Sequence, residues 1–427
     1  MGSEKEFPKV FDNFLFPKIF QTFRIAIQPS KLIIAFASLV IICLSGWILD
    51  FSRTVITSPK AQGGITELQA YITNPDRVKL HIEYYGIRGG RAGVFSTLWR
   101  FGSEKFHGAL QSLFAFDLPG VAKDIIDAFK ALMWAFRYHY FYSIVFLTIT
   151  LAVISLGGGG LCRIAALQFA GNEKPGISEA MRFSIKRFMS FFSVPLAPLG
   201  TIICIGLFIF LLGLIGNIPR IGELLIGIFM LPALIAGTLI TIVLIGTAAG
   251  FNLMFPAIVY DGSDCFDAIS RSFSYISSKP WRMGFYTAIA AVYGAVCYMF
   301  VRFFTFLLLW ITRWFLQFCI WTDNSSHKVN KLTAIWPEPS FMHLQGAPGL
   351  VTANWSESLA IFLVYLALLI VVGLLVSFVI SFYFSANTII YALMRNRVDN
   401  TALEEIYTSA AAEAKTESIA AESTLDQ

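Results

Sequence analysis

The stretch Leu359 to Ala386, LAIFLVYLALLIVVGLLVSFVISFYFSA, contains no charged residue and is longer than the helix that a bilayer requires. About 20 consecutive apolar residues suffice to cross the hydrocarbon core. Five more runs of comparable length precede it, at roughly 32–51, 141–162, 192–216, 222–250 and 284–312. We therefore predict an all-α integral membrane protein with about six transmembrane helices.

The composition of the whole chain agrees with a membrane protein. Of 427 residues, 56% are hydrophobic and 14% are charged, with a mean hydropathy of +0.67. Soluble domains carry about 25% charged residues. The six cysteines form no CxxC pair, and most fall inside apolar runs, so we interpret them as small buried side chains.

Basic residues gather beside alternate ends of the apolar runs, which predicts the orientation. Cytoplasmic loops are enriched in Lys and Arg. The relevant residues are Lys18, Arg24, Lys31, Arg163, Lys174, Arg182, Lys186, Arg187, Arg271, Lys279, Arg282, Arg395 and Arg397. Both termini are then cytoplasmic.

This orientation divides the chain into regions. We predict an amphipathic cytoplasmic N-terminal segment at 1–31, a first span at 32–51, an extracytoplasmic segment at 52–140, a five-span membrane core at 141–408 and a disordered acidic cytoplasmic tail at 409–427. The core includes an extracytoplasmic loop at 313–358. Within the segment 52–140, apolar residues at helical spacing over 94–116 and 121–136 predict two amphipathic helices on the membrane face.

A pattern after the second span recurs after the fourth. Residues 165–172 lead into 178–184, and 256–263 lead into 266–272, each time through a glycine and into a helix carrying an acidic residue, Ala and then Ser. A weaker copy at 389–396 leads to Thr401 and Glu404, whose spacing is that of a capping box at a helix start. The predicted repeated unit is a span, a polar turn and a short interfacial helix.

Four glycines end the second span and raise the question of a phosphate-binding loop. Gly157, Gly158, Gly159 and Gly160 are followed by Leu-Cys-Arg, without the Gly-Lys-Ser/Thr of a nucleotide site. We interpret them as a place for a bend or for close helix packing. Gly246 and Gly250 form a GxxxG pair with the same interpretation.

Charged residues near the spans are candidate contacts for anionic lipid headgroups. Arg163, Arg182, Lys186 and Arg187 follow the second span, where helix faces meet the inner leaflet. Arg302 and Arg313 interrupt the fifth run about three helical turns apart, so both point the same way. An anionic headgroup or substrate phosphate is one hypothesis for these two; snorkelling or pairing with a loop carboxylate is the other.

Polar residues in the sixth run allow two interpretations. Ser377, Ser381 and Ser385 recur every fourth residue, and Asn387 follows them. Such a stripe permits close helix packing, and a solute pathway is the alternative. No HExxH, GxSxG or paired histidine pattern is present, so we predict no catalytic residue, metal, cofactor or nucleic-acid site.

Several segments carry a family resemblance. Residues 26–32, 163–166, 179–183 and 390–399 resemble uncharacterised multi-pass membrane proteins of bacteria, planctomycetes in particular. Residues 261–272 are similar to the membrane region of some glycerophosphoryl diester phosphodiesterases. The resemblance implies a module of the bacterial cytoplasmic membrane. It does not imply hydrolysis, because the soluble catalytic barrel of those enzymes is not among these residues.

Three functional classes remain open. The first is a non-enzymatic scaffold, assembly or regulatory component that contacts membrane lipids and a membrane-protein partner. The second is a transporter, channel or lipid-handling protein with a mid-membrane polar site, and the third is a lipid-acting membrane enzyme. A cavity lined by Arg302, Ser377, Ser381 and Asn387 would favour transport, whereas a closed bundle would favour the scaffold.

Overall fold

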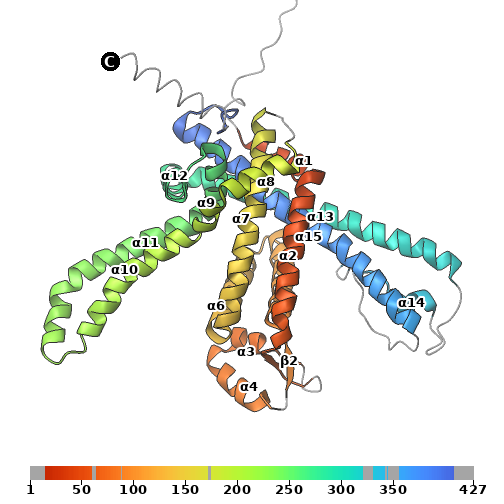
Figure 1. Cartoon of the computed structure of the whole chain (residues 1–427), viewed down its shortest axis with the longest axis horizontal. Helices are drawn as coiled ribbons and strands as arrows, with labels where there is room; N and C mark the ends of the chain where they lie inside the picture. Colours follow the sequence, from red (N-terminus) through yellow and green to blue (C-terminus); the bar gives the residue numbers. More distant parts are fainter. Residues whose placement is uncertain are drawn as a thin grey trace, which may run out of the picture. The chain divides into compact units, whose positions relative to one another are not determined.

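The protein is described by a computed structural model that covers residues 15–59, 64–87, 89–171, 175–320, 330–341, 344 and 355–407. Helices dominate these residues, which confirms the all-α class (Figure 1). The predicted tail at 409–427 and part of the loop at 313–358 lie outside the described residues. The chain divides into a first unit, 1–36 with 155–427, and a second unit, 37–154.

Among the described residues, six helices are long and apolar enough to cross a membrane, which confirms the number of predicted spans. They are α2 (Pro29–Leu49), α7 (Tyr140–Gly171), α10 (Leu196–Ile215), α11 (Ile221–Asp261), α13 (Pro280–Cys319) and α15 (Trp355–Asp399). Four of the helices extend well past the predicted spans. The extra turns belong to α7, α11, α13 and α15, and residues in them contribute to the packed core of the first unit.

The core of the first unit is built from the C-terminal parts of α11 and α15. Residues 253–260 and 385–395 are buried without interruption. Two short N-terminal helices, η1 (Phe16–Gln21) and α1 (Thr22–Ala26), pack against α15, and Ile19 and Ile25 are buried there. The predicted N-terminal segment therefore ends in helices that belong to the core.

Two short helices each pack against a long helix at a glycine of the long helix. The helix α8 (Ile177–Lys186) places Ser184 on α7, where its hydroxyl donates to the Leu156 carbonyl at 2.6 Å. A Cβ added to Gly159 would lie 2.5 Å from the Ser184 Oγ. In the same way α12 (Cys265–Ser278) covers Gly250, where an added Cβ would lie 3.5 Å from the Cβ of Ser272. The glycines thus allow close contact between helices.

The other predicted glycines have similar surroundings. An added Cβ would lie 2.6 Å from the Phe384 ring at Gly158, 3.3 Å from the Met181 sulfur at Gly160 and 2.8 Å from the Phe273 ring at Gly246. Gly157 is buried. Because α7 continues as an α-helix through all four glycines, no break in the helix accompanies them.

The prediction of a third interfacial helix after the last span is wrong. The span α15 continues as a helix to Asp399, and the described residues 400–407 after it form turns and irregular chain. Thr401 and Glu404 have capping-box spacing, but Asn396 binds the Thr401 carbonyl through its side chain at 2.8 Å instead. Tertiary contacts of 400–407, described below, prevail over this local signal.

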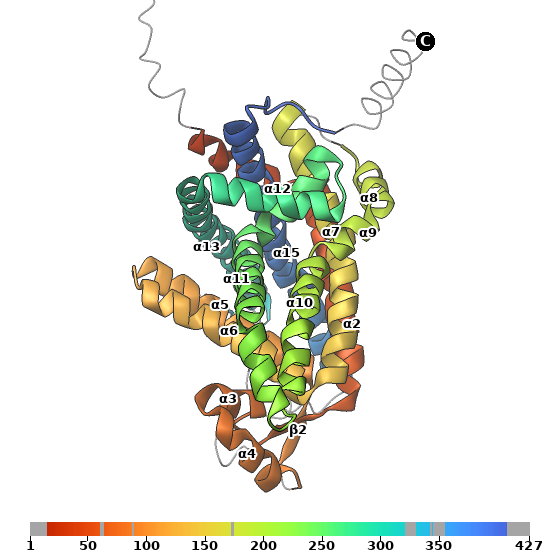
Figure 2. The ribbon, with the colours of Figure 1, turned by 90° about the vertical axis from the view of Figure 1, so that its left-hand side faces the viewer.

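The pair α10 and α11 forms a hairpin whose outer part is mostly uncovered. In α10 and in α11, only 6% of the most apolar 18-residue window is buried. The short helix α9 (Phe188–Ser193) and α11 are the main neighbours of α10. Figures 1 and 2 show α10 and α11 running side by side away from α12. Apolar surface on all sides suits a lipid environment.

The second unit holds a short two-stranded sheet and a helical hairpin. The strand β1 (Val55–Thr57) pairs antiparallel with β2 (Gly90–Ala92), and α3 (Glu67–Thr73), η4 (Pro75–Arg77) and α4 (Val78–Tyr85) connect them. The helices α5 (Val94–Phe114) and α6 (Leu118–Tyr138) then occupy the two predicted helical segments. The strands and α3, η4 and α4 were not predicted, because these elements are short.

Ion pairs join α5 to α6. The Lys105 ammonium lies 3.0 Å from the Asp124 carboxylate and 2.9 Å from that of Asp127, and Lys130 lies 3.2 Å from Asp127. Burial raises the pKa of Asp127, but hydrogen bonds and charge from the two lysines outweigh it, so the pKa is lower than usual. The ionised carboxylate is therefore the form that stabilises the hairpin.

Replacing Asp127 should destabilise the protein in a pH-dependent way. We expect Asp127→Asn to lower the free energy of unfolding at pH 7 by about 2 kcal/mol, because it leaves Lys130 without its carboxylate and Lys105 with Asp124 as its remaining one. A lowered carboxyl pKa contributes stability above the unfolded pKa of about 3.9 and loses it as the pH falls through the folded pKa. Thermal unfolding in detergent should thus show a difference at pH 7 that shrinks towards pH 3. Glu104→Gln, at an exposed site on α5, is the control; an equal loss there would contradict this account.

Candidate functional site

The C-terminal end of α11 brings together charges from three helices. The helix α11 stops at Asp261 because Gly262 adopts a left-handed conformation, with φ of 61°, that favours glycine. The chain then turns into α12, which carries Arg271. Tyr391 and Arg395 come from α15, more than a hundred residues later.

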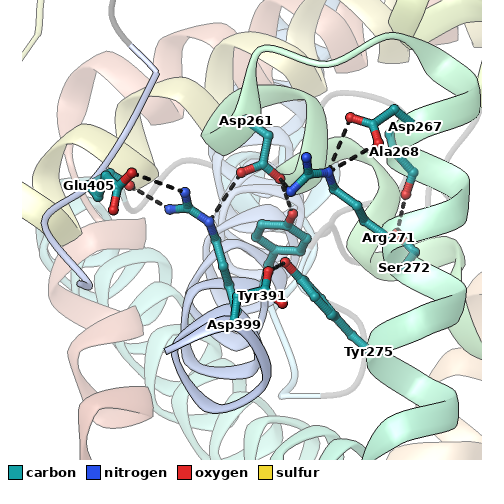
Figure 3. A network of polar contacts seen from close by, with 10 residues as sticks. Asp261, Asp267, Ala268, Arg271, Ser272, Tyr275, Tyr391, Asp399 and Glu405 are labelled. Carbon is teal, nitrogen blue, oxygen red and sulfur yellow. Dashed lines mark hydrogen bonds and ion pairs between the residues drawn. The ribbon is translucent and has the colours of Figure 1, made fainter. Parts of the chain in front are cut away.

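A buried carboxylate is the centre of this group, which we name the Asp261 cluster: Asp261, Arg271, Tyr275, Tyr391, Arg395 and Asp399 (Figure 3). Arg395 Nε lies 3.1 Å from Asp261 Oδ1, and a guanidinium nitrogen of Arg271 lies 3.6 Å from Oδ2. The Tyr391 hydroxyl donates to the same Oδ2. Because the Asp261 side chain is only 5% exposed, its charge depends on these partners.

The second carboxylate of the cluster ties α12 to the end of α15. The Tyr275 hydroxyl donates to Asp399 Oδ2 at 2.5 Å. Burial and this hydrogen bond raise the pKa of Tyr275, so the phenol stays protonated. Burial by itself lowers the pKa of Arg271, but the charges of Asp261 and Asp267 raise it by more. The pKa is therefore higher than usual, and the guanidinium stays charged.

Residues 400–407, which we name the strap, cross the cluster. The Tyr407 backbone N–H donates to the Tyr260 carbonyl at 2.9 Å. Arg163 donates to the Tyr407 carbonyl at 2.8 Å, and Arg395 donates to the Glu405 carbonyl at 2.7 Å. The ring of Tyr407 lies against Gly262, where an added Cβ would be 2.5 Å away. The strap therefore links α7, α11 and α15.

The predicted headgroup contacts divide into two groups. Arg163 and Arg187 contact the strap, since Arg187 donates to the Tyr407 hydroxyl at 3.5 Å, and Arg163 also lies over the Phe183 ring. Arg182 and Lys186 are exposed on α8. Only the second pair is free of these contacts with the strap.

Arg302 and Arg313 contact the same segment of loop. Arg302 donates to the Phe341 carbonyl through Nε at 3.1 Å and through a terminal nitrogen at 2.9 Å. Arg313 donates to the Trp336 carbonyl and to the Thr333 hydroxyl. Both side chains are buried. Loop carboxylates are one predicted set of partners for these arginines, whereas the hydrogen bonds given above go to main-chain and hydroxyl oxygens.

The serines of α15 donate their hydroxyls to backbone carbonyls. Ser381 donates to the Ala26 carbonyl at 2.7 Å, Ser377 to Gly373 at 2.7 Å and Ser385 to Ser381 at 2.5 Å. All three serines are fully buried, and Asn387 is 7% exposed. The stripe thus lies in a packed contact with α1 and α2.

Arg302 and Asn387, two of the four residues named as a transport lining, lie at different levels. The rings of Tyr293 in α13 and Phe382 in α15 are 5.9 Å apart and mark one level of this antiparallel pair. Arg302 lies nine residues to one side of that level and Asn387 five residues to the other. At 1.5 Å per residue, about 20 Å along the helices separates them.

Lys31 is a buried charge that the sequence alone does not predict. Its side chain is fully buried near the start of α2, and its ammonium donates to the Ser385 hydroxyl. The signal was a lysine at the head of an apolar run, which we interpreted as a loop charge. Asp261, Tyr391 and Arg395 stood in the repeated segments, but a single sequence gives no indication that they pair.

The cluster is suited to holding helices together. Its acids face guanidinium or phenol groups, and no group of three or more His, Cys, Asp or Glu side chains within the described part of the chain is arranged to hold a metal ion. Comparison with known proteins adds no relative: no family model, curated protein or solved structure matches the chain.

Proposed function

We propose that the protein is a non-enzymatic scaffold, an assembly or regulatory component of the bacterial cytoplasmic membrane, with both termini in the cytoplasm. The Asp261 cluster carries this proposal. Its charges bind one another and the strap, so they fix the geometry of α11, α12 and α15. A rigid junction of this kind is what a scaffold needs.

The stripe of α15 supports a scaffold over a transporter. A transport pathway requires polar groups that face one shared space. Here Ser377, Ser381 and Ser385 donate to carbonyls of packed helices, and Arg302 lies at a different level from Asn387.

The hairpin of α10 and α11 offers surface for assembly. Leu207 is 53% exposed, and its neighbours along α10 are apolar. Helices of a partner membrane protein associate by packing such surfaces in the bilayer. We propose that this hairpin contacts the partner.

Site-specific photocrosslinking in native membranes tests the scaffold. We expect p-benzoylphenylalanine at Leu207 to give one discrete adduct with another membrane protein. Trp281, which is 91% exposed near the start of α13, is the control for random collisions. Lipid adducts alone at Leu207, or the same products at both sites, would overturn the proposal. Solute flux into proteoliposomes that contain the purified protein would support the transport function in place of the scaffold.

The orientation has its own test. The native cysteines, of which Cys204 and Cys319 are exposed, are first replaced by serine. A cysteine replacing Asp264, whose side chain is 87% exposed, should then react with an impermeant maleimide only from the cytoplasmic side. One replacing the exposed Asp76 should react only from outside. The reverse pattern would contradict the assignment.

A further inference from the structure

One face of α6 is an uncovered apolar stripe. Its members recur at three- and four-residue spacing and so share a side of the helix. They are Ile125, Ile126, Phe129, Leu132, Met133 and Phe136, which we name the α6 stripe, and each is at least 43% exposed. The opposite face packs on α5 and α3 through the buried residues Asp127, Ala131, Trp134 and Ala135. Figure 2 shows α5 and α6 side by side.

Basic residues border this stripe on one side only. Lys123, Lys130 and Arg137 follow each other at seven-residue intervals, which keeps them in line along a helix. Lys123 and Arg137 are exposed, and the Lys130 side chain is 44% exposed while it pairs with Asp127. A basic line beside an apolar stripe is typical of helices that lie in a membrane interface.

Both ends of the hairpin are fixed where two spans end. Asp50, just after α2, accepts hydrogen bonds from the backbone N–H groups of Phe95 at 2.8 Å and Ser96 at 2.9 Å, at the start of α5. At the other end, α6 finishes at Tyr138 and α7 begins at Tyr140. The hairpin therefore starts and finishes at the level where α2 and α7 leave the hydrocarbon.

We propose that the hairpin of α5 and α6 docks on the bilayer at that level, with the α6 stripe among the acyl chains and Lys123, Lys130 and Arg137 on anionic phospholipid headgroups. The exposed Phe116 and Leu118 extend the apolar surface to the tip of the hairpin. The fixed ends set the depth, the stripe supplies apolar contact and the basic line selects headgroup charge. This inference does not depend on the scaffold function.

Photocrosslinking on the two faces of the hairpin tests the docking. The full chain is reconstituted in nanodiscs of phosphatidylcholine and phosphatidylglycerol, with p-benzoylphenylalanine at Phe129 or, as control, at the exposed Gln111 of α5, next to the polar side of that helix. We expect phospholipid adducts on the peptide containing position 129 and little or none at 111. Equal yields at both positions, or none at 129, would overturn the proposal.

The basic line has a separate test in the same system. Adducts at position 129 should contain phosphatidylglycerol in excess of the supplied ratio, because basic residues near the membrane surface attract anionic headgroups. Lys123→Gln combined with Arg137→Gln should bring the ratio back towards that supplied. Arg77→Gln with Lys79→Gln, two exposed sites in η4 and α4, should leave it unchanged. If the phosphatidylglycerol enrichment persists in the Lys123→Gln, Arg137→Gln variant, or falls equally in the Arg77→Gln, Lys79→Gln variant, the basic residues of α6 do not bind the headgroups.

Discussion

Asp261→Asn should lower the free energy of unfolding by about 3 to 5 kcal/mol, the range found when one partner of a buried ion pair is removed. The substitution leaves Arg395, whose side chain is 10% exposed, with only the exposed Glu405 carboxylate at 3.9 Å, and it weakens the acceptor of the Tyr391 hydroxyl. Thermal and denaturant unfolding of the purified protein in detergent would measure the loss. The folded yield should fall with it.

Two variants separate the cluster from general charge effects. Asp267→Asn removes another partner of Arg271, but that carboxylate is 49% exposed, so its loss should be below about 1 kcal/mol. Adding Arg395→Gln to Asp261→Asn removes the buried charge that has lost its closest carboxylate, and it should recover part of the stability. If Asp261→Asn and Asp267→Asn lose the same amount, the cluster does not hold the helices together.

Gly159→Val should destabilise the contact between α7 and α8 by about 2 to 3 kcal/mol. A side chain there would lie 2.5 Å from the Ser184 Oγ and 2.8 Å from the ring of Phe191, which is fully buried and has little room to move. The melting temperature in detergent should fall, and the fall should be smaller for Gly159→Ala.

The matched control is a glycine with open space around it. Nothing lies within 4 Å of a Cβ added to Gly206 in α10. Gly206→Ala should therefore be neutral or stabilising by up to about 1 kcal/mol, since alanine favours the helix. A gain in stability for Gly159→Ala of the same size would mean that α8 does not rest on this glycine.

The spans could be predicted because a bilayer imposes one length and one composition on every helix that crosses it. Residues 359–386 meet both conditions by themselves, and so do the other five runs. Gly262 was also predictable as a turn, because a glycine after an apolar stretch is a common helix end. These are local properties, and a single sequence contains them.

Contacts between distant residues could not be predicted in the same way. Nothing in the order of residues indicates that Arg163 binds the Tyr407 carbonyl, 244 positions away, or that Lys31 reaches Ser385. The predicted helix at Thr401 failed for this reason. Its capping signal is worth about 1 kcal/mol, less than the several hydrogen bonds that hold the strap.

The lengths of the long helices have a consequence for how deep the protein sits. The helix α11 has 41 residues and α15 has 45, about 60 and 67 Å at 1.5 Å per residue, whereas the hydrocarbon layer is about 30 Å thick. In each helix an apolar stretch of 18 residues accounts for about one such thickness. The remaining turns therefore extend beyond the acyl chains, and we call them the extramembrane turns. Ion pairs of the Asp261 cluster hold the extramembrane turns together. A thicker or thinner membrane would therefore be accommodated by tilting of the α10 and α11 hairpin, while the extramembrane turns keep their arrangement.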